Sequence, residues 1–289
     1  MSDEKSLKYN EPWILQRADP YVYRHTDGSY YFTASVPAYD GIVLRRAGTL
    51  AELSGAEEVM VWKKHESGPM SYHIWAPEIH YLFGKWYIYF AGGEAEDIWK
   101  IRPYVLECSG DDPLTDEWVE LGKMKRAAED EFSFEAFSLD ATVFENKGEY
   151  YYVWAEKVGV GKMISNLYIA KMESGNQLKT VQVLLTTPDY DWERKGFWVN
   201  EGPAVIHHDG KMFLTYSASE TGVDYCVGML SIDEDADILD PRLWKKERYP
   251  VLKTCEKLGI YGPGHNSFTV DEDGNDVMVY HARTEAEIN

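Results

Sequence analysis

The chain has 289 residues, of which 44% are hydrophobic, 14% aromatic and 27% charged, a composition that supports a packed globular core. Its 29 Lys and Arg face 49 Asp and Glu, and the net charge of −20 disfavours nucleic acid and anionic membranes as partners. No run approaches the roughly 18 apolar residues of a membrane span. We therefore expect a partner that is neutral or cationic.

The first ten residues, MSDEKSLKYN, are polar and lack the apolar stretch of a secretory signal, which predicts a cytoplasmic location. A signal segment removed from the sequence would leave the same pattern, so secretion stays as the alternative. The three cysteines, Cys108, Cys226 and Cys255, are far apart and odd in number. This pattern favours reduced thiols over a disulfide framework.

One pattern recurs five times along the chain: an extended run, a turn with glycine, an aromatic-rich run, and then alanine. Each copy reads as a β-hairpin. The copies begin at Ala18, Trp75, Leu139, Asn200 and Gly264. The turn glycines are Gly28, Gly84, Gly148, Gly210 and Gly274, and the closing alanines are Ala34, Ala91, Ala155, Ala218 and Ala282.

These two series of markers keep nearly the same spacing, and further strand-like runs lie between the hairpins, such as residues 41–47 and 58–64. A repeat of this kind is typical of propeller blades. The sequence therefore predicts an all-β fold, a five-bladed β-propeller with a central channel, formed by residues 1–289 as a single domain. Only fifteen residues follow Gly274, so the fifth blade is expected to lack strands at the C-terminus. Residues 1–16 supply one of them, or the sequence is a shortened version of a longer one.

In a propeller the first strand of each blade lines the channel, so equivalent positions form a ring at one mouth. The position nine residues before each turn glycine holds Asp19, Trp75, Leu139 with Asp140 beside it, Glu201, and His265. Each acid alone also has an interpretation as a turn former. Three carboxyl groups in one narrow mouth, however, repel one another and raise at least one pKa, a strain that is common at functional sites.

Paired carboxyl groups suit the cleavage of glycosidic bonds, in which one acid protonates the leaving oxygen and a base activates water. Asp19 and Glu201 belong to blades that are not sequential neighbours, which favours the wider separation of about 6.5–9.5 Å used by inverting enzymes. Asp140 borders Glu201, and we expect it to keep that carboxyl group protonated by repulsion and a hydrogen bond.

Three further residues are candidates for binding substrate. Trp75 offers a flat face for a sugar ring, His73 lies two residues before it on the same side, and Arg283 adds a fixed cation. Channel packing and an ordinary surface ion pair are the alternative interpretations. His265 follows Gly262, Pro263 and Gly264, which would deliver its imidazole to the channel, either as a metal ligand or as a hydrogen-bonded channel residue.

Taken together, these motifs resemble glycoside hydrolase family 43. The resemblance covers most of the chain and rests on five segments: Ala18-Asp19-Pro20, Ser138-Leu139-Asp140, Asn200-Glu201-Gly202-Pro203, HIWAPE at 73–78 and GPGHNS at 262–267. It implies a five-bladed propeller and an inverting mechanism in which Asp19 is the general base, Asp140 tunes the acid, and Glu201 is the general acid. It implies no cofactor for the chemistry, but a Ca²⁺ ion near His265.

Within that family the segments 18–37 and 65–80 look most like exo-acting α-L-arabinofuranosidases. The expected substrate is then a neutral arabinan or arabino-oligosaccharide. Three alternatives stay open at this point: a β-xylosidase, an endo-arabinanase, and a propeller that binds sugar without cleaving it. Several relatives of this kind are secreted, which conflicts with the cytoplasmic prediction.

Overall fold

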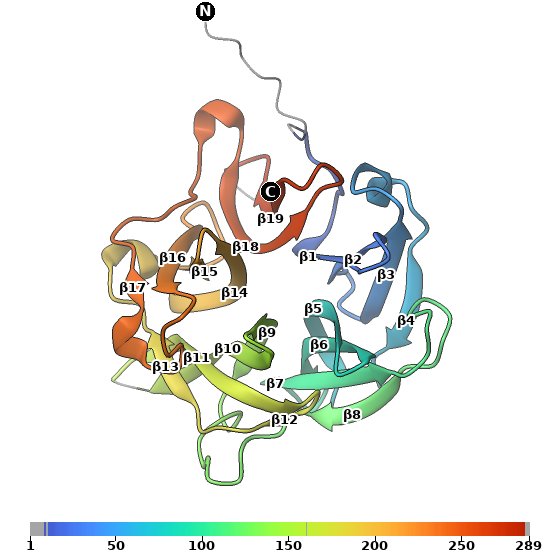
Figure 1. Ribbon diagram of the computed structural model, residues 1–289. Coiled ribbons are helices and arrows are strands. Elements are labelled where there is room, and N and C mark those ends of the chain that lie inside the picture. The colour runs from blue at the N-terminus through green and yellow to red at the C-terminus, as the bar shows by residue number, and fades with distance from the viewer. Residues whose placement is uncertain (1–8, 10, 160, 287–289) are drawn as a thin grey trace, which may run out of the picture.

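The computed structural model describes residue 9 and residues 11–159 and 161–286 of the chain. These residues form nineteen β-strands and four short 3-10 turns, with no α-helix among them. No helix in this described part is long and apolar enough to cross a membrane. The sheets stand around a common centre, and β1, β5, β9, β14 and β18 are the innermost strands (Figure 1).

The first two sheets are four-stranded antiparallel meanders, each with its strands in chain order. The first consists of β1 (Ala18–Arg24), β2 (Tyr30–Ser35), β3 (Gly41–Ala47) and β4 (Val59–Lys63). The second consists of β5 (Tyr72–Leu82), β6 (Lys85–Glu94), β7 (Asp97–Cys108) and β8 (Val119–Lys123).

Two further meanders are joined into one nine-stranded sheet, because β11 pairs in parallel with β14 through Ile164–Trp198 and Ser165–Val199. One part holds β9 (Ser138–Asn146), β10 (Glu149–Gly159), β11 (Met163–Ser174), β12 (Gln177–Leu178) and β13 (Val183–Thr186). The other holds β14 (Trp198–His208), β15 (Lys211–Ala218), β16 (Cys226–Asp233) and β17 (Lys245–Lys246).

The last sheet has only two strands, β18 (Tyr261–Val270) and β19 (Asp276–Arg283). The 3-10 turns are η1 (Ala51–Ser54), η2 (Asp191–Glu193), η3 (Pro241–Leu243) and η4 (Glu256–Leu258). Residues 11–16 form no strand, although Trp13 and Ile14 pack on the buried cluster of the first sheet, on which Val277 and Val279 of β19 also pack. Of the expected N-terminal strand, residues 1–8 and 10 lie outside the described residues.

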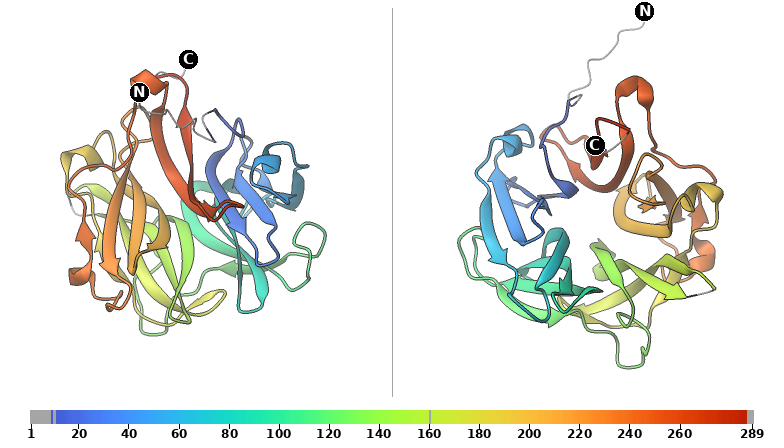
Figure 2. Two further views of the ribbon diagram at one scale, coloured as in Figure 1. Left: turned by 45° about the horizontal axis from the view of Figure 1, so that its top comes forward. Right: turned by 180° about the vertical axis from the view of Figure 1, so that it is seen from behind.

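The five predicted hairpins are confirmed. Each pairs antiparallel across its glycine turn, and the five turn glycines have φ between 73° and 89°, a conformation that a side chain disfavours. The first and last sheets also lie side by side in the ring (Figure 2). There the Ser267 hydroxyl donates to the Pro20 carbonyl at 2.8 Å, and the Tyr30 hydroxyl donates to the Val270 carbonyl at 2.8 Å.

Aromatic and branched side chains fill the space between neighbouring sheets. Tyr89 of β6, with Tyr152 and Trp154 of β10, is fully buried in one such cluster between the second and third meanders. Burial of side chains of this size is the main stabilising contribution available to an all-β ring. This packing holds the inner strands in place around the centre.

Candidate active site

The inner strands share one backbone irregularity near the same end. A residue with left-handed φ stands at that point in each strand, at Asp19 (54°), Ala76 (46°), Asp140 (53°), Gly202 (52°) and His265 (42°). In each hairpin the pairing register shifts there, as it does at a β-bulge. A bulge turns side chains out of the regular alternation, and it does so five times around one centre. Four of these positions are not glycine, so the backbone strain is real.

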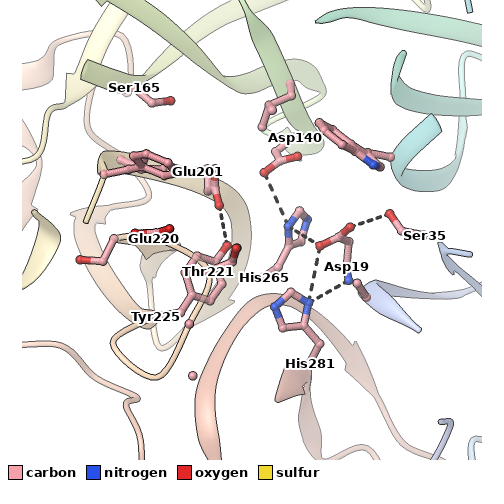
Figure 3. A pocket seen from close by; sticks show the side chains of 18 of the residues that line it. Asp19, Ser35, Asp140, Ser165, Glu201, Glu220, Thr221, Tyr225, His265 and His281 are labelled. Carbon is pink, nitrogen blue, oxygen red and sulfur yellow. Dashed lines mark hydrogen bonds and ion pairs between the residues drawn. The ribbon is translucent and has the colours of Figure 1, made fainter. Parts of the chain in front are cut away.

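A pocket of about 850 Å³ opens at this end of the ring. Its lining includes Asp19 from β1, Asp140 from β9, Glu201 from β14, and His265 from β18 (Figure 3). The structure thus brings the four predicted ionisable residues into one site. In Figure 3 the carboxyl groups of Asp19 and Glu201 stand apart, and the His265 ring lies between them.

Asp19 is held in its ionised form. Its Oδ2 accepts a hydrogen bond from the Ser35 hydroxyl at 2.5 Å, and its Oδ1 lies 3.1 Å from His265 Nδ1. Burial alone would raise the pKa of Asp19, but the charge and hydrogen bond of His265, with smaller contributions from His281 and Ser35, lower it far below its ordinary value. An ionised carboxylate of this kind is suited to accept a proton from water.

His265 supplies the positive charge at the centre of the site. Its Nδ1 lies 3.1 Å from Asp19 Oδ1 and 3.6 Å from Asp140 Oδ2. Burial lowers the pKa of His265, but Asp19 and Asp140 outweigh this effect and raise the pKa to about 10. The ring is therefore an imidazolium at neutral pH, and it offsets part of the repulsion among the acids.

The other two acids are shifted in the opposite direction. Burial, with repulsion from Glu201 and Asp19, raises the pKa of Asp140 well above its ordinary value. Burial also raises the pKa of Glu201, against a hydrogen bond from Tyr225. Asp140 Oδ2 accepts a hydrogen bond from the Gly202 N–H at 3.2 Å, so Asp140 contacts the backbone directly after Glu201. A carboxyl group that stays protonated at higher pH is suited to donate a proton.

Two site residues were missed by sequence reasoning. Tyr225 donates its hydroxyl to Glu201 Oε1 at 2.8 Å, and His281 Nδ1 accepts the Asp19 N–H at 3.0 Å. Tyr225 precedes β16 outside the repeat pattern, so no register pointed to it. His281 directly precedes the closing alanine Ala282, and the extra register shifts of the β18–β19 hairpin bring it to the site. These shifts leave no mark in the sequence.

Of the predicted binding residues, Trp75 and Arg283 line the pocket, and Arg283 donates to the Thr221 carbonyl at 3.3 Å. His73 does not reach the lining. Its ring contacts Trp75 (4.2 Å) and Trp99 (5.1 Å) at tilted angles, and both of its nitrogens are buried without a hydrogen-bond partner in the described part of the chain. Burial lowers the pKa of His73, which favours a neutral ring packed beside the two indoles.

The aromatic lining is wider than the sequence indicated. Trp99 and Phe197 both line the pocket, with 61% and 62% of their surfaces exposed. Exposed aromatic faces at a pocket rim are suited to pack against the apolar faces of sugar rings. No spacing rule in the sequence separates these two residues from the many buried aromatics.

The predicted calcium ion is not supported by the site. Calcium takes six to eight oxygen ligands, whereas the His265 nitrogen faces two carboxylates that already bind Ser35 and Gly202. Within the described ranges, no group of three or more His, Cys, Asp or Glu has a geometry that could hold a metal ion. The residues present do not fit the ion, and no step below involves one.

An ionised carboxylate and a protonated carboxyl group facing one sugar-sized pocket define a class of enzyme, the glycoside hydrolases. The chain belongs to glycosyl hydrolases family 43, whose sequence profile matches residues 9–288. This confirms the resemblance drawn from the motifs.

Known proteins of the family are similar over nearly the whole chain. Extracellular exo-α-(1→5)-L-arabinofuranosidases of Streptomyces avermitilis and Streptomyces chartreusis are each 49% identical, over 98% and 97% of this chain. The chain spans 58% of the first protein's length and 84% of the second's. A crystal structure of an α-L-arabinofuranosidase from Lactobacillus brevis is 52% identical and matches with a TM-score of 0.90, covering 97% of this chain and 88% of that one.

The expectation of a cytoplasmic location is wrong. Both Streptomyces relatives carry the word extracellular in their names. A signal segment is removed from a mature chain, so a polar first segment is no evidence against export.

Proposed function

We propose that this protein is an inverting, exo-acting α-L-arabinofuranosidase that releases arabinose from arabinan or arabino-oligosaccharides. The observation that carries the proposal is the convergence of Asp19, Asp140 and Glu201 from three separate strands on one pocket, and the lowered pKa of Asp19 with the raised pKa of Glu201 agrees with it. The names of the relatives, at 49% to 52% identity, support the sugar and the exo mode.

The hydrolysis is a single displacement. Asp19 takes a proton from a water molecule, whose oxygen bonds to the anomeric carbon on one face of the sugar. On the other face the bond from that carbon to the leaving oxygen breaks, and Glu201 protonates this oxygen. Attack opposite the leaving group inverts the configuration. Each carboxyl group ends the step in the other's protonation state, and exchange with solvent resets both.

Asp140 acts on the acid and does not react itself. As a buried group it contacts the Gly202 N–H, directly after Glu201, and lies 3.6 Å from His265. Repulsion between Asp140 and Glu201 disfavours the state in which both are ionised, so the two neighbouring carboxyl groups retain a proton for catalysis. Trp75 and Arg283 are assigned to the wall that holds the substrate.

The architecture proposed with this function is one five-bladed propeller domain. Three four-stranded meanders, the five-stranded group β9–β13 and the β18–β19 hairpin, arranged around one centre, support this assignment (Figure 1). The fifth blade has two strands in the described part of the chain. The names of the relatives support secretion as the location.

The test is hydrolysis of 4-nitrophenyl α-L-arabinofuranoside and of linear arabino-oligosaccharides. Glu201→Gln and Asp19→Asn should each lower kcat by about 10²–10⁴-fold, because each removes one proton transfer. Proton NMR of the first product should show the inverted anomer. A retained anomer would refute the mechanism, and oligosaccharide products longer than arabinose would indicate endo action. Faster cleavage of an aryl β-xyloside would point to a xylosidase, and binding without turnover to a sugar-binding propeller.

A further inference from the structure

Two stacked rings bridge the acid and the base of the site. The rings of Tyr225 and His281 lie 5.7 Å apart, centroid to centroid, with an interplanar angle of 19°. Tyr225 reaches Glu201, and His281 reaches Asp19 (Figure 3). Neither ring has a role in the mechanism above, although both line the pocket.

The contact of Tyr225 singles out one oxygen of Glu201. The phenol donates to Oε1 at 2.8 Å, and the side chain is 1% exposed. Burial and the nearby acids raise the pKa of Tyr225 well above its ordinary value, so the group remains a donor. An oxygen that accepts this bond is the poorer site for a proton. The catalytic proton of Glu201 is therefore directed to Oε2.

The backbone around Tyr225 leaves its ring little freedom. Its N–H donates to the Gly222 carbonyl at 3.2 Å. A Cβ on Gly264 would lie only 2.2 Å from Tyr225 Cε1, so the ring packs directly on the backbone before His265. A Cβ on Gly262 would lie 1.9 Å from the same Gly222 carbonyl oxygen. Gly264 is thus needed for the close approach of this ring, and Gly262 for that of the Gly222 carbonyl, which accepts the N–H of Tyr225.

His281 has the matching place on the base side. Its Nδ1 accepts the Asp19 N–H at 3.0 Å, at a residue whose φ is 54°. Burial, as the largest cause, lowers the pKa of His281 to about 4. The ring is therefore neutral at neutral pH, and its Nδ1 lone pair is free to accept the bond. It satisfies a backbone donor that the bulge takes out of the sheet ladder.

We propose that Tyr225 is a positioning residue for the general acid. It fixes the proton of Glu201 on Oε2, and its stacking on His281 fixes the position of Glu201 relative to Asp19. The inference rests on the function proposed above and adds a residue to that site. Its consequence is that loss of the Tyr225 hydroxyl impairs protonation of the leaving group, whereas loss of the His281 nitrogen impairs the base.

The test compares two substrates that differ in their need for the acid. Phenyl α-L-arabinofuranoside has a poor leaving group that must be protonated, and the 2,4-dinitrophenyl compound leaves with little help. Tyr225→Phe should lower kcat for the phenyl substrate by about tenfold or more and change kcat for the dinitrophenyl substrate by less than about threefold. His281→Phe, which keeps a stacking ring, should lower both values by the same factor.

Tyr216→Phe is the matched control. It also removes a buried phenol that binds a carboxylate, Glu193 at 2.9 Å, but Tyr216 is not in the pocket lining. It should leave the ratio of the two kcat values unchanged even where Tm falls. Should Tyr225→Phe fail to fold, Gly264→Ala displaces the same ring while keeping its hydroxyl, and the same selective loss is expected.

Two failures are distinguishable. Wild-type protein that cleaves neither arabinofuranoside contradicts the proposed function itself. Wild-type protein that cleaves both, with a Tyr225→Phe variant that loses equal factors on the two substrates, overturns the positioning role alone. A Tyr216→Phe control that also loses kcat selectively on the phenyl substrate would overturn it too, because the effect would then follow from general loosening of the sheet.

Discussion

At the scale of single residues, the site works because identical chemical groups have different surroundings. Asp19 and Asp140 both face His265, yet only Asp19 also accepts a hydrogen bond from a side-chain hydroxyl, that of Ser35 at 2.5 Å. The pKa of the first is lowered and the pKa of the second is raised. One imidazolium cannot neutralise three carboxylates. Asp19, the acid with the most favourable hydrogen bonds to its charged form, is therefore the one that stays ionised.

Lys157 provides a test of this electrostatic balance. Its Nζ lies 3.7 Å from the centroid of the Phe137 ring, and its charge lowers the pKa of Glu201 against the effect of burial. Lys157→Met should therefore raise the pKa of Glu201. Because the acid must be protonated to react, the alkaline limb of the profile of kcat/KM against pH should move to higher pH.

The control for this prediction is Lys162→Met. Lys162 also lines the pocket, with its Nζ 4.5 Å from the centroid of the Trp198 ring, but its charge is not among the main influences on Glu201. Its alkaline limb should coincide with that of the wild type. A Lys157→Met profile that is unchanged, or that moves to lower pH, would contradict the assignment of that limb to Glu201.

At the scale of elements, the hairpins were predictable and the details of their pairing were not. A turn glycine followed by an aromatic run fixes a hairpin locally, and the ring position nine residues earlier leads to Asp19, Glu201 and His265. The bulges and the shifted register of β18 and β19 depend on contacts between distant segments. For this reason His281 was missed, and His73 was expected in a lining that it does not reach.

Glu156 stabilises a segment of the pocket wall without lining the pocket itself. It follows the closing alanine of its hairpin, but its carboxylate is buried and accepts from Phe134 N (3.0 Å), Ala136 N (3.1 Å) and Trp154 Nε1 (2.8 Å). These bonds anchor the segment before β9, in which Phe137 lines the pocket. Glu156→Ala leaves three buried donors without their acceptor and should lower the free energy of unfolding by about 3 kcal/mol.

Denaturant unfolding with the wild type as reference measures this change. Glu145→Ala is the surface comparison, because Glu145 is exposed on β9 and, among the residues that the structure describes, accepts only the Gly148 N–H of the adjoining turn. Its effect should stay within about 0.5 kcal/mol. Equal stability of Glu156→Ala and wild type would mean that water replaces all three bonds and that the segment is held by its other contacts.

At the scale of the whole molecule, the general base and the histidines that contact it come from opposite ends of the chain. Asp19 belongs to the first strand, and its partners His265 and His281 belong to the last two. The site therefore forms only when the first and last sheets meet, and the sequence indicated this through the spacing of its repeats. The sequence did not indicate what joins the two sheets, since Trp13 and Ile14 lie in a segment without periodic pattern.

Trp13 is the clearest test of that junction. It packs edge-on against Phe32 at 6.1 Å, and it covers the same buried cluster of the first sheet on which Val277 and Val279 of the last sheet also pack. Trp13→Ala should lower the free energy of unfolding by about 2–4 kcal/mol, somewhat less than for a fully buried tryptophan, and lower Tm. Below that Tm the value of kcat should be retained, because no reacting group is touched. A Trp13→Ala protein as stable as the wild type would show that the hydrogen bonds of Ser267 and Tyr30 alone close the ring.

Trp99→Ala should behave in the opposite way. The side chain of Trp99 is 61% exposed at the pocket rim, so its loss should leave Tm unchanged and raise the KM for arabino-oligosaccharides.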